Sequence, residues 1–215
     1  CTKLTEISFA TNSKLSRIEI GCFYNCSSLT SIAIPDNVDY IYQNSFKGCT
    51  NLKTVSFNYL SSKLTAISQC CFKDCYNLEN ITLPKSIKDI CIGAFQNCAS
   101  LKSITIPENV DRVYNDSFNG CTSLESVTFA GSSTQDLIVY KTAFQNLPAL
   151  KTVTINKYKS LTFEENTFAS CNNLSTVNFP ISSSGSIDIA GISFGTGSFA
   201  GTPVYNLMKF IFPNI

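Results

Sequence analysis

One pattern, Phe-x-x-Cys-x-x-Leu-x-x-Ile-x-Ile, recurs along this sequence from its first residues to its last. The copy at Phe144 has Leu147 in the Cys position, and the copy at Phe199 has Thr202 there. Consecutive copies start about 23–26 residues apart, apart from the last at 31, and such a copy is too short to bury its own apolar side chains. Neighbouring copies must therefore stack into an elongated body. The copies that keep Phe, Cys and Leu begin at Phe23, Phe46, Phe72, Phe95, Phe118 and Phe168.

The Ile-x-Ile part of each copy predicts a short β-strand. Apolar residues alternate there with period 2, so that both branched side chains face the same side. Stacking places these strands side by side and parallel on one face, with short helical turns and loops elsewhere. The sequence thus predicts an α/β repeat fold with nine short strands in one sheet. Those strands are expected at Ile7, Ile32, Val55, Ile81, Ile104, Val127, Val153, Val177 and Phe210.

The Phe and Cys of each copy, three positions apart, are expected on one side of a single helical turn. Two residues after the Phe, nearly every copy has Gly, Asn or Asp, the residues that tolerate a positive φ. We expect this position to end the turn in a left-handed conformation. The residues concerned are Asn25, Gly48, Asp74, Asn97, Gly120, Asn146, Ser170 and Gly201.

Composition favours a folded repeat body over the other classes of chain. The sequence is 44% hydrophobic and 14% charged, whereas a disordered chain is poor in large apolar residues. Its formal net charge of +1 argues against a nucleic-acid surface, which needs clustered Lys and Arg. No apolar run approaches the ~18 residues of a membrane span. We expect one domain over residues 1–215, with an irregular final repeat at about 181–215.

The 11 cysteines invite a disulfide or zinc interpretation, which the repeat argues against. Cysteines in one repeat position stack at roughly 4.8 Å with parallel Cα–Cβ vectors, whereas a bridge needs vectors that face each other. We expect them to be buried, reduced and weak S–H donors. If one bridge forms, Cys70 with Cys91 is the least strained pairing. The sequence has no His, and no set of four Cys lies close enough for a zinc site.

No catalytic constellation is visible in the sequence. Without His, neither a Ser-His nor a Cys-His nucleophile pair can be built. The glycines between 185 and 201 lack the spacing and the Lys of a phosphate-binding loop. The paired carboxylates Glu164 and Glu165 are interpreted as solvated loop residues. We expect no enzyme activity, no cofactor and no metal.

The unit that runs from Ile32 to Leu52, and again from Ile104 to Leu124, closely resembles the BspA-like leucine-rich repeat family. The resemblance covers nearly all of the chain and implies a right-handed leucine-rich repeat solenoid. It also implies an extracellular or cell-surface location on a bacterium or protist, and an adhesin-like partner such as a host matrix or cell-surface protein. A structural spacer without a ligand of its own is the alternative.

Tyrosines provide the first candidate for a partner-binding surface. Tyr42, Tyr114 and Tyr140 each stand four residues before a repeat Phe, and Tyr40 is nearby. Tyr114 and Tyr140 belong to adjacent copies and are expected to stack. Such a ladder stabilises the solenoid by itself. The same residues, if exposed, would provide the aromatic contacts that dominate many protein interfaces.

A second candidate is a row in which Lys53, Lys102 and Lys151 alternate with Glu79 and Glu125 just before successive strands. Opposite charges on neighbouring strands stabilise a sheet without any ligand, by roughly 0.2–1 kcal/mol per pair. The lysines are also candidates for a partner contact. The Ser and Thr rows beside them could bind a glycan, although they offer no aromatic platform.

Overall fold

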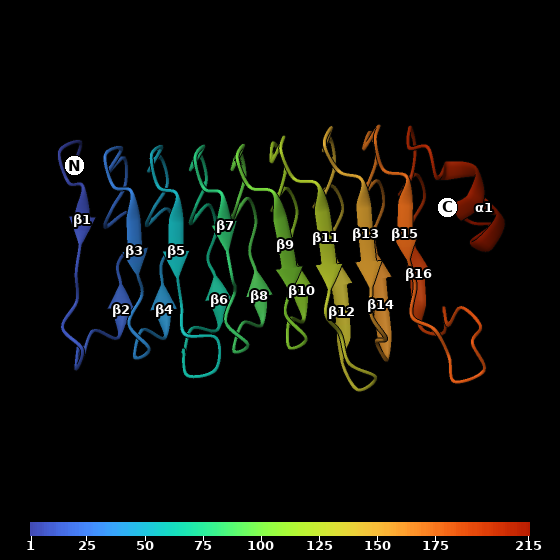
Figure 1. Cartoon of the computed structure of the whole chain (residues 1–215), viewed down its shortest axis with the longest axis horizontal. Helices are drawn as coiled ribbons and strands as arrows, with labels where there is room; N and C mark the ends of the chain where they lie inside the picture. The colour runs from blue at the N-terminus through green and yellow to red at the C-terminus, as the bar shows by residue number, and fades with distance from the viewer.

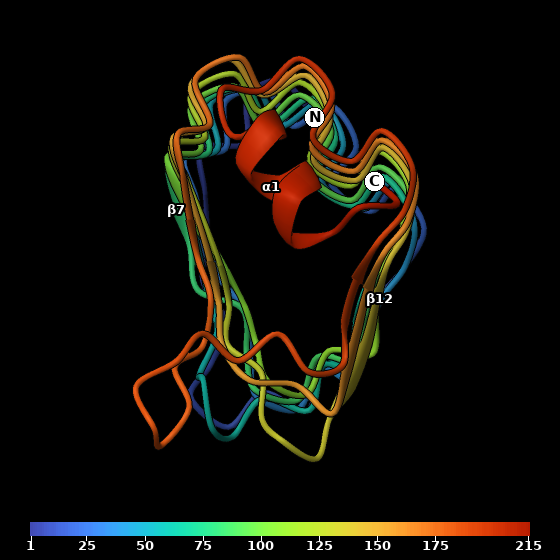
Figure 2. The ribbon, with the colours of Figure 1, turned by 90° about the vertical axis from the view of Figure 1, so that its right-hand side faces the viewer.

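The computed structural model describes residues 1–215, and in it the chain winds as a regular stack of coils (Figure 1). Each coil contributes one strand to each of two opposite faces, and the side chains between these faces form one hydrophobic core (Figure 2). The odd-numbered strands form the face that the Ile-x-Ile pattern predicts. They are β1 (Glu6–Ile7), β3 (Ser31–Ala33), β5 (Thr54–Ser56), β7 (Asn80–Ile81), β9 (Ser103–Ile106), β11 (Ser126–Phe129), β13 (Thr152–Ile155) and β15 (Thr176–Asn178).

The even-numbered strands form a second parallel face that the sequence did not predict. Most of them have only two residues, too few to show an alternating pattern. Six of these strands, β6, β8, β10, β12, β14 and β16, form one sheet, and β2 pairs with β4. The strands are β2 (Arg17–Ile18), β4 (Tyr40–Ile41), β6 (Ala66–Ile67), β8 (Asp89–Ile90), β10 (Arg112–Val113), β12 (Asp136–Val139), β14 (Ser160–Phe163) and β16 (Ile192–Phe194).

Parallel pairing on the odd-numbered face keeps corresponding repeat positions side by side. Ile32 lies opposite Val55, for example, and Val127 lies opposite Ile104. The pairing is interrupted once: β1-β3-β5-β7 and β9-β11-β13-β15 are separate four-stranded sheets. Strands β7 and β9 are neighbours in the stack but do not pair as a ladder.

The ninth strand expected at Phe210 is wrong, because this residue belongs to α1 (Tyr205–Ile211). Val204 and Met208 are one helical turn apart and buried, so the segment covers the last coil with a helical face. Phe210 lies on the outer side and is 86% exposed. With seven residues, α1 is too short to cross a bilayer.

The repeat phenylalanines form a continuous ladder through the core. Neighbouring rings from Phe23 to Phe199 have centroids 4.8–5.7 Å apart and interplanar angles of 8–19°. Seven of the rings are fully buried, and each fills the space between two coils. Burial of a Phe side chain stabilises a fold by roughly 1.5–3 kcal/mol. This ladder therefore connects every coil to the next.

The repeat cysteines link each coil to the preceding one through their thiols. The Sγ of Cys49 donates to the carbonyl oxygen of Phe23 at 3.1 Å, and the Sγ of Cys98 donates to that of Phe72 at 3.2 Å. All 11 cysteines are free; the repeat cysteines are buried as expected, except Cys1, which is exposed. The other thiols with this bond belong to Cys75, Cys121 and Cys171.

The turn that carries Phe and Cys contains two left-handed residues. All eight residues expected two positions after the Phe have a positive φ, from 55° at Asn25 to 80° at Gly120. The residue two positions before the Phe is also left-handed in every copy, and the sequence did not predict this second position. Thr142 is there despite its branched side chain, and its hydroxyl donates to Asp116 Oδ1 at 3.0 Å. Each turn thereby reverses direction within a few residues.

Candidate functional site

The four tyrosines predicted from the sequence lie on the outer side of the even-numbered face. Tyr40 is in β4, directly before the buried Ile41, and Tyr42 follows it. Tyr114 and Tyr140 follow the buried last residues of β10 and β12. Because side chains alternate along a strand, a residue beside a buried one points away from the core. We call these four residues the tyrosine surface.

The tyrosine surface consists of two pairs of rings. Tyr114 and Tyr140 stack with centroids 4.9 Å apart and an interplanar angle of 2°, which confirms the expected stacking. Tyr40 and Tyr42 have centroids 4.5 Å apart and a tilt of 47°. The two pairs are separated by the coils that carry β6 and β8. The aromatic rings therefore do not form one continuous ladder.

A hollow of about 320 Å³ lies between the two pairs. Tyr40 and Tyr114 line it, and the small residues Ala66 and Cys91 line the part between them. Ala66 corresponds to Tyr40 in the preceding coil, and Cys91 corresponds to Tyr114 in the following coil. Because both side chains are smaller than tyrosine, the surface is lower there. Ile92, which is 45% exposed, adds an apolar edge. A signal for this hollow is present in the sequence, because the position four residues before the repeat Phe is Tyr42 and Tyr114 in the flanking copies but Ser68 and Cys91 in the two between.

Asp89 brings a carboxyl group to the hollow. Its Oδ1 atom is buried and accepts no hydrogen bond, and Arg112 Nη1 lies 3.7 Å from it. Partial burial raises the pKa of Asp89 above its ordinary value, while the nearby Arg112 opposes the rise. Arg112 Nη1 also donates to the Tyr114 hydroxyl at 3.3 Å. Arg112 therefore links the carboxyl group to one aromatic wall.

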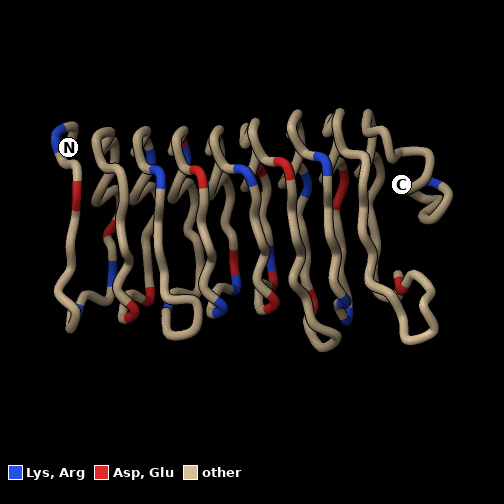
Figure 3. Tube along the Cα trace, in the orientation of Figure 1, with Lys and Arg blue, Asp and Glu red and all other residues tan.

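The lysine row is on the other face of the solenoid, directly before the odd-numbered strands. Lys53, Lys102 and Lys151 are exposed and alternate with Glu79 and Glu125 along the stack (Figure 3). Only the pair between Lys151 and Glu125 is close, with 3.0 Å between Nζ and Oε2. Pairs as exposed as this one contribute little to stability, about 0–1 kcal/mol. The structure does not bring these lysines together with the tyrosine surface.

No group of three or more Cys, Asp or Glu side chains is arranged to hold a metal ion. Burial raises the pKa of the Cys91 thiol, which lines the hollow, to about 11. A thiol with such a pKa is almost entirely protonated near neutral pH and is a weak nucleophile. The chemistry available in the hollow is therefore aromatic contact, apolar contact, one carboxyl group and the carboxamide of Gln69.

Comparison with protein families identifies the repeat. The family model described as BspA type leucine-rich repeat region, in six copies, matches residues 1–99, 56–174 and 88–207. This chain belongs to the BspA-type leucine-rich repeat family. Its two-faced stack of short parallel strands is the leucine-rich repeat solenoid of that family. No curated protein sequence matches the chain significantly.

Solved structures of bacterial leucine-rich repeat proteins share this fold. The leucine-rich repeat protein of T. pallidum superposes with a TM-score of 0.68 at 26% identity, over 84% of this chain and 81% of that one. A leucine-rich repeat protein of Eubacterium ventriosum gives 0.51 at 19% identity, over 87% and 62%. The pneumococcal vaccine antigen PcpA gives 0.58 at 23% identity, over 83% of this chain and 44% of its own.

Proposed function

We propose that this chain is a non-catalytic protein-binding module of a cell-surface or secreted protein. Its partner is an extracellular protein, of the host matrix or of a cell surface. Membership of the BspA-type family supports the location, as does the similarity to a structure described as a vaccine antigen. The two aromatic walls of the tyrosine surface, which face each other across one hollow, are the observation that carries the proposal.

The hollow favours insertion of a partner side chain between Tyr40 and Tyr114. Energetically dominant interface residues are enriched in Tyr and are typically found in pockets that exclude water. Tyr40 is 44% exposed even though it contacts Tyr42, so an aromatic surface remains free for a partner. The Arg112 hydrogen bond holds Tyr114 in place before binding, which lowers the entropic cost of association.

The experiment is a binding measurement on the immobilised chain with fibronectin, laminin, collagen and intact host cells as probes. We expect micromolar binding to at least one of them. Replacing Tyr40 and Tyr42 by Ser, or Tyr114 and Tyr140 by Ser, should weaken that binding by about tenfold or more, because each pair forms one wall. The measurement is made by surface plasmon resonance, with cells counted by microscopy.

The control replaces Tyr24 and Tyr76, which are each 46% exposed and do not line the hollow, by Ser. This variant should bind like the unchanged chain. If every probe fails to bind at micromolar concentration, the chain is a structural spacer. If both pairs of tyrosine variants bind as well as the control, the contact lies elsewhere, and the variant with Lys53, Lys102 and Lys151 changed to Ala tests the lysine row.

A further inference from the structure

The interruption between β7 and β9 leaves backbone groups without partners. In the pair β3–β5, Ile34 N–H donates to the Ser56 carbonyl oxygen at 2.9 Å. The corresponding bond, from Leu83 N–H to the Thr105 carbonyl oxygen, is not formed. The N–H and C=O groups of Leu83, which face β9, make no hydrogen bond within the chain. Since Leu83 is only 2% exposed, its amide is poorly placed to find bulk water as a substitute.

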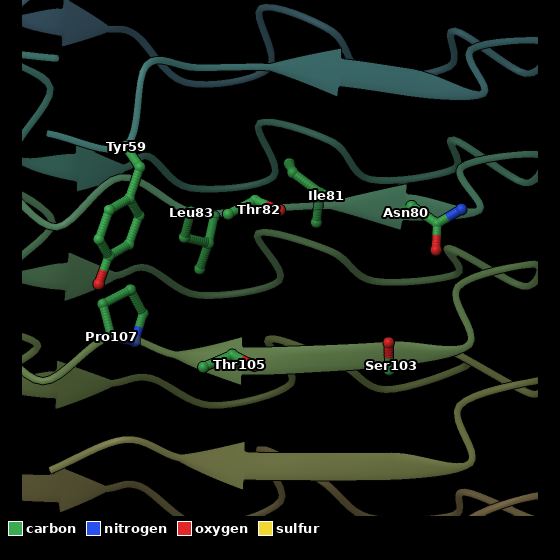
Figure 4. Close-up of a pocket in the computed structure, with 8 residues that line it drawn as sticks. All are labelled: Tyr59, Asn80, Ile81, Thr82, Leu83, Ser103, Thr105 and Pro107. Atoms are coloured by element: carbon green, nitrogen blue, oxygen red, sulfur yellow. The ribbon is translucent and has the colours of Figure 1, made fainter. Parts of the chain in front are cut away.

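A hollow of about 190 Å³ opens at this interruption. Asn80 and Thr82 line it from β7 and the residues after it, while Ser103 and Thr105 line it from β9 (Figure 4). We call this hollow the β7–β9 notch. An amide and three hydroxyls each offer a donor and an acceptor, and no charged side chain lines the notch. The lining therefore fits a neutral ligand that carries several donors and acceptors.

Tyr59 gives the notch an aromatic wall that the sequence did not predict. It comes from the loop at 58–62, and in Figure 4 its ring extends across the gap toward Pro107, beside Leu83. The ring is 44% exposed. Lys85 N–H donates to the Tyr59 carbonyl oxygen at 2.9 Å and fixes the loop over the next coil. Tyr59, Leu83 and Pro107 form an apolar end to an otherwise polar site.

We propose that the β7–β9 notch binds one neutral monosaccharide unit of a glycan. A pyranose ring has hydroxyls on its edge and C–H groups on its faces, which match the hydroxyl-lined floor and the Tyr59 ring. The volume suits a single sugar ring. An added peptide strand is disfavoured, because it would need a long free strand edge, whereas β7 has only two residues. The Asn80, Ser103 and Thr105 side chains supply the hydrogen bonds to the sugar, and the backbone of Leu83 and Thr105 lies directly beside it.

This binding is separate from the tyrosine surface, because the notch is on the odd-numbered face and the tyrosines are on the even-numbered face. A glycan in the notch and a protein at the tyrosine surface would not compete. Failure of one proposal therefore leaves the other standing.

The test is a nuclear magnetic resonance titration of the isotope-labelled full chain. The probes are the methyl glycosides of glucose, galactose, mannose, fucose, N-acetylglucosamine and N-acetylgalactosamine. We expect at least one to bind with a millimolar dissociation constant, and to shift the backbone amides of Leu83 and Thr105 more than any amide near Tyr40 or Tyr114. If none of the six shifts these amides at saturating concentration, the proposal is overturned.

Two variants and a control test the assignment of the residues. Tyr59→Ala removes the aromatic wall, and Thr105→Val removes one hydroxyl while keeping the shape of the side chain. Each should weaken binding of the active glycoside by about tenfold. Tyr76→Ala removes a tyrosine of similar exposure outside the notch and should bind like the unchanged chain. Unchanged binding by Thr105→Val and Tyr59→Ala, with an unchanged amide spectrum elsewhere, would contradict the proposal.

Discussion

At the scale of single residues, each turn around a repeat Phe depends on two positions with a positive φ, one on either side of the Phe. The position two residues after each repeat Phe was identified because Gly, Asn and Asp recur there, and these residues tolerate a positive φ. The equivalent position before the Phe was missed, although it carries the same residue types in most copies. Cys70 and Thr142 obscure the pattern there, since neither residue type favours the left-handed region.

Gly120 is expected to tolerate no side chain. Its φ is +80°, and a Cβ there would lie 2.2 Å from Asn97 Oδ1. Gly120→Ala should reduce the free energy of unfolding by about 3 kcal/mol, which combines the cost of a left-handed Ala with that of overpacking. Urea unfolding followed by circular dichroism measures the loss.

Gly185 provides the matched control for this substitution. Its φ is +81°, and nothing lies within 4 Å of an added Cβ. Gly185→Ala should therefore cost only about 1–2 kcal/mol, the contribution of the backbone. In a chain that already carries Asn97→Gly, the clash with Asn97 is absent. There, Gly120→Ala should reduce the free energy of unfolding only by the backbone contribution of about 1–2 kcal/mol. Equal losses for the two glycine variants would mean that Asn97 moves aside freely.

The buried thiols predict how stability depends on pH. Burial raises the pKa of Cys49 to about 12 from an ordinary value of 9.0. The folded chain thus keeps this proton to a higher pH than the unfolded chain does. The free energy of unfolding should fall as the pH rises above 9, by up to about 1.4 kcal/mol per pH unit for each such thiol.

Urea unfolding between about pH 8 and pH 11 tests this dependence against the Cys49→Ala variant. Near pH 8 the variant is less stable, because it lacks the S–H donor to Phe23. Its stability should fall less steeply above pH 9, since one titrating thiol is absent. Lys and Tyr titrate alike in both proteins and cancel in the comparison. Parallel curves would show that Cys49 titrates normally in the folded chain.

At the scale of elements, the sequence predicts strands that alternate and misses strands that do not. The first eight expected strands are confirmed as the odd-numbered strands from β1 to β15. Two large apolar residues separated by one residue mark each of them. The two-residue strands of the even-numbered face, such as β8, offer no period to detect. Only β12, β14 and β16 show one, as in Leu137-x-Val139. The last expected strand is α1 instead, and its buried Met208 packs this segment on the core as a helix.

The phenylalanine ladder predicts that a central truncation costs more than a terminal one. Phe95 is fully buried and stacks on Phe72 at 5.5 Å and on Phe118 at 5.2 Å. Phe95→Ala should cost ~3–5 kcal/mol through lost burial and the remaining cavity. Phe23 is half-buried and stacks on Phe46 alone, so Phe23→Ala should cost clearly less.

Chemical denaturation measures both losses, and amide hydrogen exchange shows where they act. In a solenoid, energy is shared mainly between adjacent repeats, so Phe95→Ala should raise exchange most in the coils next to it. A loss below ~1 kcal/mol for Phe95→Ala would mean that the ring is not needed to fill the core.

At the scale of the whole molecule, stacking brings together residues that the sequence separates by many positions. Tyr40 and Tyr114 were both predicted as contact residues, but their position on opposite walls of one hollow depends on small side chains in the two coils between them. Tyr59 was not predicted at all, because its loop is an insertion whose direction is fixed only by the next coil. Sites of this kind depend on contacts between coils, which the repeat pattern does not encode.

Helix α1 also determines what the C-terminal end of the stack can do. A coil that ended in bare strands would offer unpaired N–H and C=O groups to another chain, as any open sheet edge does. Instead, Met208 is fully buried against the last coil, and Phe212 packs its ring at 71° to that of Phe194, with 5.0 Å between centroids. The backbone groups inside a helix are already paired with one another. Residues 204–212 therefore shield the apolar interior of the coil formed by β15 and β16 through side-chain packing, and not by adding a strand to either sheet.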